Sequence, residues 1–105
     1  MLFRSATARR ILAVREEHRA LITQHLGRAA GNGHRVLESL YDRPIVNVQA
    51  IEQLIGGTYA AANSLVSRLE QLGILREMTG QKRNRRFCYQ PYVELFGDSP
   101  QEVLA

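Results

Sequence analysis

The chain lacks the features that mark secreted and membrane proteins. Its 105 residues include a single cysteine, Cys88, so an internal disulfide is impossible. No apolar targeting run opens the chain, and no apolar span is long enough to cross a bilayer. These absences fit a soluble, cytoplasmic protein without a membrane partner. Cys88 lies in an apolar stretch, so we expect a small buried hydrophobic residue, with a reactive thiol as the alternative.

Patterns typical of catalytic and metal sites are also missing. The histidines are His18, His25 and His34, and no Cys, Asp or Glu completes a set with metal-ligand spacing around them. No Ser-His-Asp or Cys-His arrangement suggests itself, and no glycine-rich phosphate loop follows a predicted strand. We therefore expect no catalytic residue, no metal and no cofactor. The histidines are expected to serve packing or an interface.

Positive charge is unevenly distributed along the chain. The formal net charge is +4, and 45% of residues are hydrophobic, which is ordinary for one globular domain. Residues 1–36 hold seven Arg and two Glu, and residues 76–86 hold five cations and Glu77. Residues 37–75 hold two Arg and four acids, and the rest holds three acids. Cationic surface is thus expected on the first helix and at residues 76–86, but not between them.

The longest helical pattern covers residues 6–29. Its apolar face is formed by Ile11, Val14, His18, Leu21, Ile22, His25, Leu26 and Ala29. Such a helix is about 36 Å long, more than a small core needs, so we expect it to project or to pack on a partner. Gly31-Asn32-Gly33 is predicted to break it. A second helix is predicted from His34 to Tyr41, ahead of Pro44.

A compact helix-turn-helix and a basic hairpin follow. A helix capped by Asn47 ends at Gly56, and a second helix capped by Thr58 ends at Gly73. Residues 74–79 and 85–90 are predicted strands joined by residues 80–84, with Ile45 and Val46 as a short third strand. The pattern predicts a mainly α fold with a small β-hairpin, namely a winged helix-turn-helix preceded by a long N-terminal helix.

Three segments follow from this pattern. Residues 1–30 are predicted to be a linker or docking helix, residues 33–96 the winged helix-turn-helix domain, and residues 97–105 a flexible tail. Within the domain, the short amphipathic segment 92–96 is expected to pack back on the core.

Two runs of sequence carry a resemblance to a known family. Residues 58–75, TYAAANSLVSRLEQLGIL, and residues 80–92, GQKRNRRFCYQPY, are similar to the C-terminal region of long Fic-family proteins. Residues 8–19 look like the segment that joins the Fic core to this region. The resemblance implies a winged helix appended to an AMP-transferring core that lies upstream. It departs from the family at Ala60 and Ala61, where Pro and Thr are expected.

The catalytic Fic motif itself is not matched. Gly31-Asn32-Gly33 invites comparison with HxFx(D/E)GNGRxxR, but Leu26, Arg28, Ala30 and His34 occupy the positions of the base, the Phe, the metal-binding acid and the phosphate-binding Arg. We therefore expect that this chain is not an enzyme.

The predicted function is binding of double-stranded DNA, with a transcription-regulatory role. Helix 58–72 would lie in the major groove and the basic wing 80–86 on the backbone. The candidate contact residues are Thr58, Tyr59, Asn63, Ser64, Ser67, Arg68, Lys82, Arg83, Arg85 and Arg86. Asn63 would contact adenine, and Arg68 guanine or a phosphate. The plain alternatives are a solvated helix face and a soluble charged turn.

A second functional hypothesis comes from another class. The same fold would be a protein interaction or dimerisation module, in which residues 6–29 dock on a Fic core or on a second copy of the chain. The slightly acidic helix-turn-helix favours this alternative.

Overall fold

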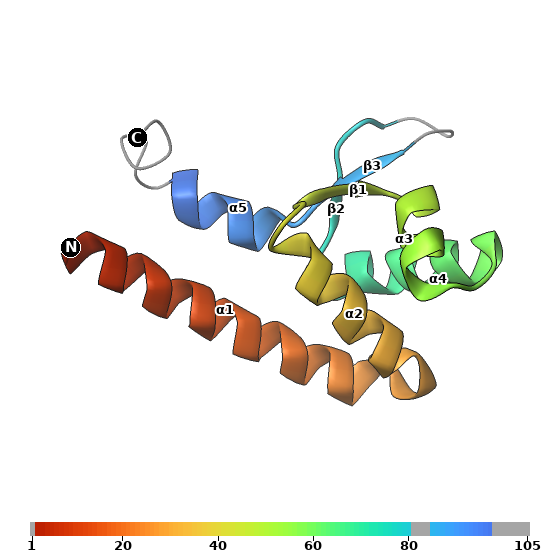
Figure 1. Ribbon diagram of the computed structural model, residues 1–105, viewed down its shortest axis with the longest axis horizontal. Coiled ribbons are helices and arrows are strands. Elements are labelled where there is room, and N and C mark those ends of the chain that lie inside the picture. Colours follow the sequence, from red (N-terminus) through yellow and green to blue (C-terminus); the bar gives the residue numbers. More distant parts are fainter. Residues whose placement is uncertain (1, 81–84, 98–105) are drawn as a thin grey trace.

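A computed structural model describes residues 2–80 and 85–97 (Figure 1). The described elements are α1 (Leu2–His25), the 3-10 turn η1 (Gly27–Ala29), α2 (Ala30–Leu40), β1 (Ile45–Asn47), α3 (Val48–Ile55), α4 (Tyr59–Gln71), β2 (Arg76–Glu77), β3 (Arg86–Cys88) and α5 (Gln90–Gly97). The predicted class, mainly α with a small antiparallel sheet, is confirmed. The order of elements from α2 to β3 is compatible with a winged helix.

The sheet has the order β1-β3-β2, and both pairs are antiparallel. Val46 and Glu77 both lie opposite Phe87, the central residue of β3. The predicted third strand is therefore present, whereas the hairpin strands are shorter than predicted. Leu75 is buried, and its N–H bonds to the carbonyl of Leu69, so this residue completes the end of α4 instead of pairing in the sheet.

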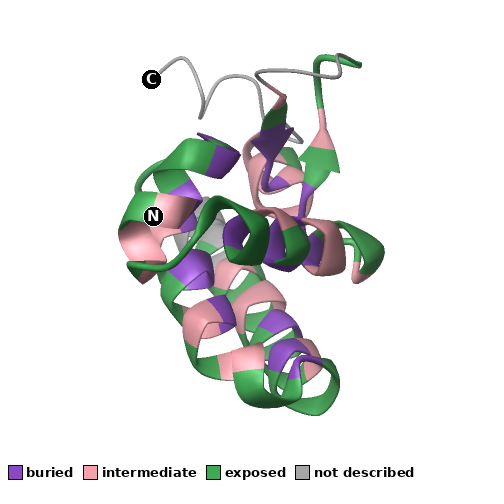
Figure 2. Cartoon of the chain, turned by 90° about the vertical axis from the view of Figure 1, so that its right-hand side faces the viewer, coloured by how far each residue is buried: buried purple, intermediate pink, exposed green. Residues whose placement is uncertain are grey.

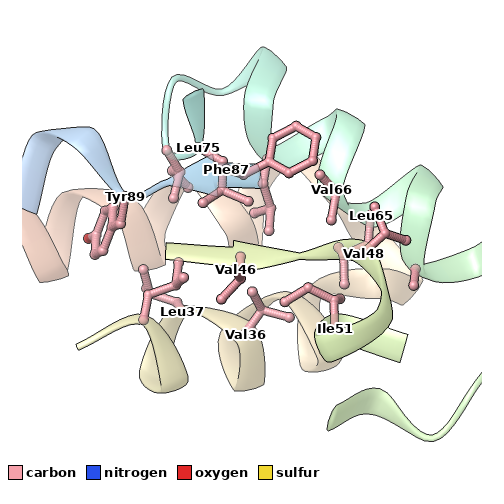
Figure 3. Close-up of a cluster of buried hydrophobic side chains, with 14 of the residues drawn as sticks. Val36, Leu37, Val46, Val48, Ile51, Leu65, Val66, Leu75, Phe87 and Tyr89 are labelled. Carbon is pink, nitrogen blue, oxygen red and sulfur yellow. The ribbon is translucent and has the colours of Figure 1, made fainter. Parts of the chain in front are cut away.

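One hydrophobic core joins the helices to the inner face of the sheet. Figure 2 shows the buried residues on the sides of the elements that face one another, and Figure 3 shows the cluster between them. The cluster is formed by Ile22, Leu26, Val36, Leu37, Leu40, Val46, Val48, Ile51, Ala62, Leu65, Val66, Leu69, Ile74, Leu75, Phe87 and Tyr89. Cys88 is a free, buried thiol, as predicted, and burial raises its pKa.

The ends of α3 and α4 agree with the sequence prediction. The Asn47 side chain accepts a hydrogen bond from the Ala50 N–H at 2.8 Å, and Thr58 Oγ1 accepts one from the Ala61 N–H at 3.1 Å. Gly56 and Gly73 have φ of 71° and 80°, the left-handed conformation that ends each helix. The tight connection between α3 and α4 thus follows from local sequence.

The predicted helix break at Gly31-Asn32-Gly33 is wrong. α1 ends at His25, the chain turns at Gly27 with φ of 52°, and α2 already runs from Ala30 through both glycines. A Cβ on Gly33 would lie 2.7 Å from Leu26 Cδ1 and 2.9 Å from Ile22 Cγ2. Gly33 therefore serves the close approach of two helices rather than a reversal of the chain.

The long first helix packs within the chain. Ile22 and Leu26 belong to the same core as the helix-turn-helix, so residues 1–30 and 33–96 share one set of buried side chains. His18 is buried, whereas His25 of the predicted apolar face is exposed. α5 lies along α1 (Figure 1), so the apolar side of α1 is covered by α2 and α5.

An aromatic cluster joins α1, α2 and α5. His18 Nδ1 lies 2.7 Å from the Tyr89 hydroxyl, which is 3.4 Å from the hydroxyl of Tyr41. The Tyr92 ring stacks on Tyr89 with centroids 5.5 Å apart, and Phe96 meets Tyr92 edge-on at 5.1 Å. The prediction that residues 92–96 pack back on the core is confirmed. Burial lowers the pKa of His18 and raises that of Tyr89. Of the predicted tail, residues 98–105 lie outside the described residues.

Candidate nucleic-acid interface

The outward face of α4 is almost free of charge. The helix is 13 residues long, about 20 Å, which suits a major groove. Its inward residues Ala62, Leu65, Val66 and Leu69 are buried against the core. The opposite face presents Ala60, Ser64 and Gln71, which are exposed, together with the half-buried Ser67; Tyr59 is exposed at the N-terminal end. This face offers hydroxyls, an amide and one aromatic ring.

Arg68 does not lie on that outward face. Its Nη2 donates a hydrogen bond to the carbonyl oxygen of His25 at 2.7 Å. His25 is the last residue of α1, where carbonyls lack partners in the helix, so the Arg68 guanidinium caps that end. We therefore assign Arg68 to the packing of α1 on α4. Thr58 also has a structural contact, because its hydroxyl oxygen caps α4.

Two arginines share the outer face of the sheet. Arg86 and Cys88 are two residues apart on β3 and so point to the same side, and Arg76 lies directly opposite Cys88. Arg76 and Arg86 are both exposed. Arg76 contributes to the basic charge of residues 76–86 but is not among the predicted contact residues. Only the register of β2 on β3 brings it beside Arg86.

The hairpin is attached to α4 at its base. Arg85 Nη2 donates a hydrogen bond to Asn63 Oδ1 at 2.8 Å, and the Arg85 guanidinium carbon lies 5.4 Å from the Phe87 ring centroid. Asn63 and Arg85 are 22 residues apart, and each of them is a separate predicted DNA contact. The structure brings these two predicted residues together, and it places the start of β3 beside α4.

An acidic side chain shapes the turn that leads into the hairpin loop. The Glu77 carboxylate accepts hydrogen bonds from the Gly80 N–H and the Thr79 hydroxyl, and Gly80 has φ of 66°. The Glu77 carboxylate is thereby directed at the turn that follows β2. Lys82 and Arg83, the remaining predicted cations of the wing, lie outside the described residues.

Comparison with models of known protein families found no match, and comparison with curated protein sequences found none. The resemblance to the Fic family therefore stays a prediction. Within residues 2–80 and 85–97, no group of three or more His, Cys, Asp or Glu side chains is placed to hold a metal ion. No helix in this described part of the chain is long and apolar enough to cross a membrane.

Proposed function

We propose that this chain binds double-stranded DNA through the outer face of α4 and the basic hairpin together. The hairpin contributes positive charge from Arg76 and Arg86, and its sequence adds Lys82 and Arg83. α4 contributes the neutral polar face around Ser64 and Ser67. Since phosphate contacts supply affinity and base contacts supply selectivity, this distribution fits binding that is driven mainly by the hairpin.

A single observation carries the proposal. The hydrogen bond from Arg85 to Asn63 fixes the start of β3 against α4, so a cationic strand and a groove-sized helix stand on neighbouring surfaces. A duplex that seats α4 in its major groove has its phosphates within reach of such a strand. A hairpin on the far side of the core would remove this support.

The test is a titration of a short labelled duplex at several salt concentrations, read by fluorescence anisotropy. Each phosphate neutralised contributes about −0.9 to the log–log slope of affinity against salt. We expect Arg86→Ala to flatten the slope by about that amount. The matched control is Arg9→Ala, which removes the same charge from an exposed position on the first half of α1, away from the hairpin (Figure 1).

Two results would refute the proposal. One is the absence of salt-dependent binding by the parent chain at low salt. The other is an equal loss of slope in Arg86→Ala and Arg9→Ala, which would show that binding follows net charge and not the hairpin.

The alternative function, an interaction module that docks through residues 6–29, is favoured by one exposed residue. Leu12 is 56% exposed on α1. The apolar side of the helix is already covered, so a Fic core or second copy would have to bind the side that carries Leu12. Deletion of residues 1–28 is a poor test, because it removes Ile22 and Leu26 from the core. Light scattering of the intact chain and of the Leu12→Glu variant is a better test. If two copies associate through this side of α1, the parent chain is a dimer and the variant is a monomer.

A further inference from the structure

Two consecutive arginines where β3 begins have different surroundings. Arg85 directly precedes β3, and its guanidinium carbon lies 5.4 Å from the ring centroid of Phe87, which is buried on the inner side of the sheet. Arg86, the next residue, points to the outer face. Arg85 is half-buried, with its guanidinium against the Phe87 ring and the Asn63 amide, while Arg86 is exposed. The sequence presents Arg85 and Arg86 as equal cations of one basic run. The structure gives them different contacts.

The contact also fixes the orientation of Asn63. An arginine side chain only donates hydrogen bonds, so the atom that it meets must be the Asn63 oxygen, and the amide nitrogen must point away from it. A bidentate contact of asparagine with adenine requires the oxygen to accept from the base and the nitrogen to donate. Here the oxygen already accepts from a cation at 2.8 Å. Asn63 is therefore better suited to holding the hairpin than to reading adenine.

We propose that Arg85 is a positioning residue, which holds the hairpin at a fixed angle to α4 through Asn63 and Phe87 while Arg86 meets the phosphates. Its consequence for DNA rests on the proposed function. A hairpin fixed before binding loses less conformational freedom when it meets the duplex, so the contact raises affinity without touching DNA.

The first experiment needs no DNA. The Met78 N–H donates to the Arg86 carbonyl at 2.8 Å, so its hydrogen exchange, measured by NMR, reports the order of the hairpin next to Arg85. We expect Asn63→Ala and Arg85→Ala each to speed this exchange about tenfold, the scale of one hydrogen bond to a charged group. The double variant should exchange no faster than the faster single variant, because both remove the same contact. Arg86→Ala is the matched control and should leave the rate unchanged.

The second experiment uses the labelled duplex and the salt series. Arg85→Ala should weaken DNA binding by a similar factor at every salt concentration and leave the log–log slope of affinity against salt unchanged. Asn63→Ala, which removes no charge, should have the same effect. Arg86→Ala should make the log–log slope of affinity against salt less steep by about 0.9.

Unchanged exchange of the Met78 amide in both single variants would overturn the positioning role. The positioning role would also be overturned if Arg85→Ala made the log–log slope of affinity against salt less steep by about 0.9, since Arg85 would then be a phosphate contact. If the parent chain does not bind DNA, the proposed function fails, and the exchange measurement still decides whether Arg85 positions the hairpin.

Discussion

The contact between α1 and α2 can be tested with two glycines of the same helix. Gly31 and Gly33 both lie in the first turns of α2, but a Cβ on Gly31 has no neighbour within 4 Å. A Cβ on Gly33 would meet Leu26 Cδ1 at 2.7 Å and Ile22 Cγ2 at 2.9 Å. Both partners are almost fully buried, so neither can swing into solvent to make room.

The expected effects have opposite signs. Replacement of glycine by alanine in a helix stabilises the folded protein by up to about 1 kcal/mol, partly by restricting the unfolded chain. Gly31→Ala should stabilise the folded protein in this way, but by less than about 1 kcal/mol, because Gly31 lies in the first turn of α2. Gly33→Ala receives a gain of the same kind but adds a methyl group to a filled contact, which costs about 1–3 kcal/mol. We therefore expect Gly33→Ala to be less stable than Gly31→Ala by about 1–3 kcal/mol.

Urea denaturation followed by circular dichroism measures this difference directly, because the helix-propensity terms largely cancel between the two variants. In a thermal scan, each 1 kcal/mol corresponds to about 4 °C at this chain length. If Gly33→Ala proved as stable as Gly31→Ala, the close approach of α1 and α2 at this glycine would be refuted, and with it our explanation of why the glycines do not break the helix.

Three further predictions concern the aromatic cluster and Arg68. Burial, partly opposed by Glu17, lowers the pKa of His18, so the unfolded chain binds a proton at this imidazole more readily than the folded chain does. The free energy of unfolding should therefore fall between pH 7 and 5. In urea titrations, His18→Gln should flatten this pH dependence. Tyr89→Phe leaves the buried His18 Nδ1 without its partner and should cost about 1–3 kcal/mol in the same assay; Tyr41→Phe, whose hydroxyl lies 3.4 Å from that of Tyr89, should cost less. Arg68→Met should cost about 1 kcal/mol through the lost cap of α1 and leave the DNA salt slope unchanged, whereas a slope reduced by about 0.9 would make Arg68 a phosphate contact.

Most elements were predictable because their signals are local. Asn47 and Thr58 bond to N–H groups three residues later, and Gly56 and Gly73 adopt the left-handed conformation that ends a helix. Each such feature is confined to a few consecutive residues, so the order of elements and the mainly α class could be predicted. The same reasoning failed at Gly33, since a glycine that allows close packing and one that breaks a helix are identical in sequence.

The candidate site was predicted less well. Residue type identified Arg68, Arg85 and Asn63 as possible DNA contacts, and each of them has a partner within the chain. Arg76 is not among the predicted contacts, although strand register places it on the outer face with Arg86. Charge is visible in the sequence, but the surface on which a charge emerges is not.

The sequence alone determined where α3 and α4 start and stop and which segments are basic, because capping, glycine conformation and charge depend on near neighbours. Tertiary structure decided the packing of α1 on the core, the capping of His25 by Arg68 across 43 residues, and the attachment of the hairpin to α4 through Asn63 and Arg85. These contacts join residues that are far apart along the chain, so their geometry exists only after the core has brought the elements together.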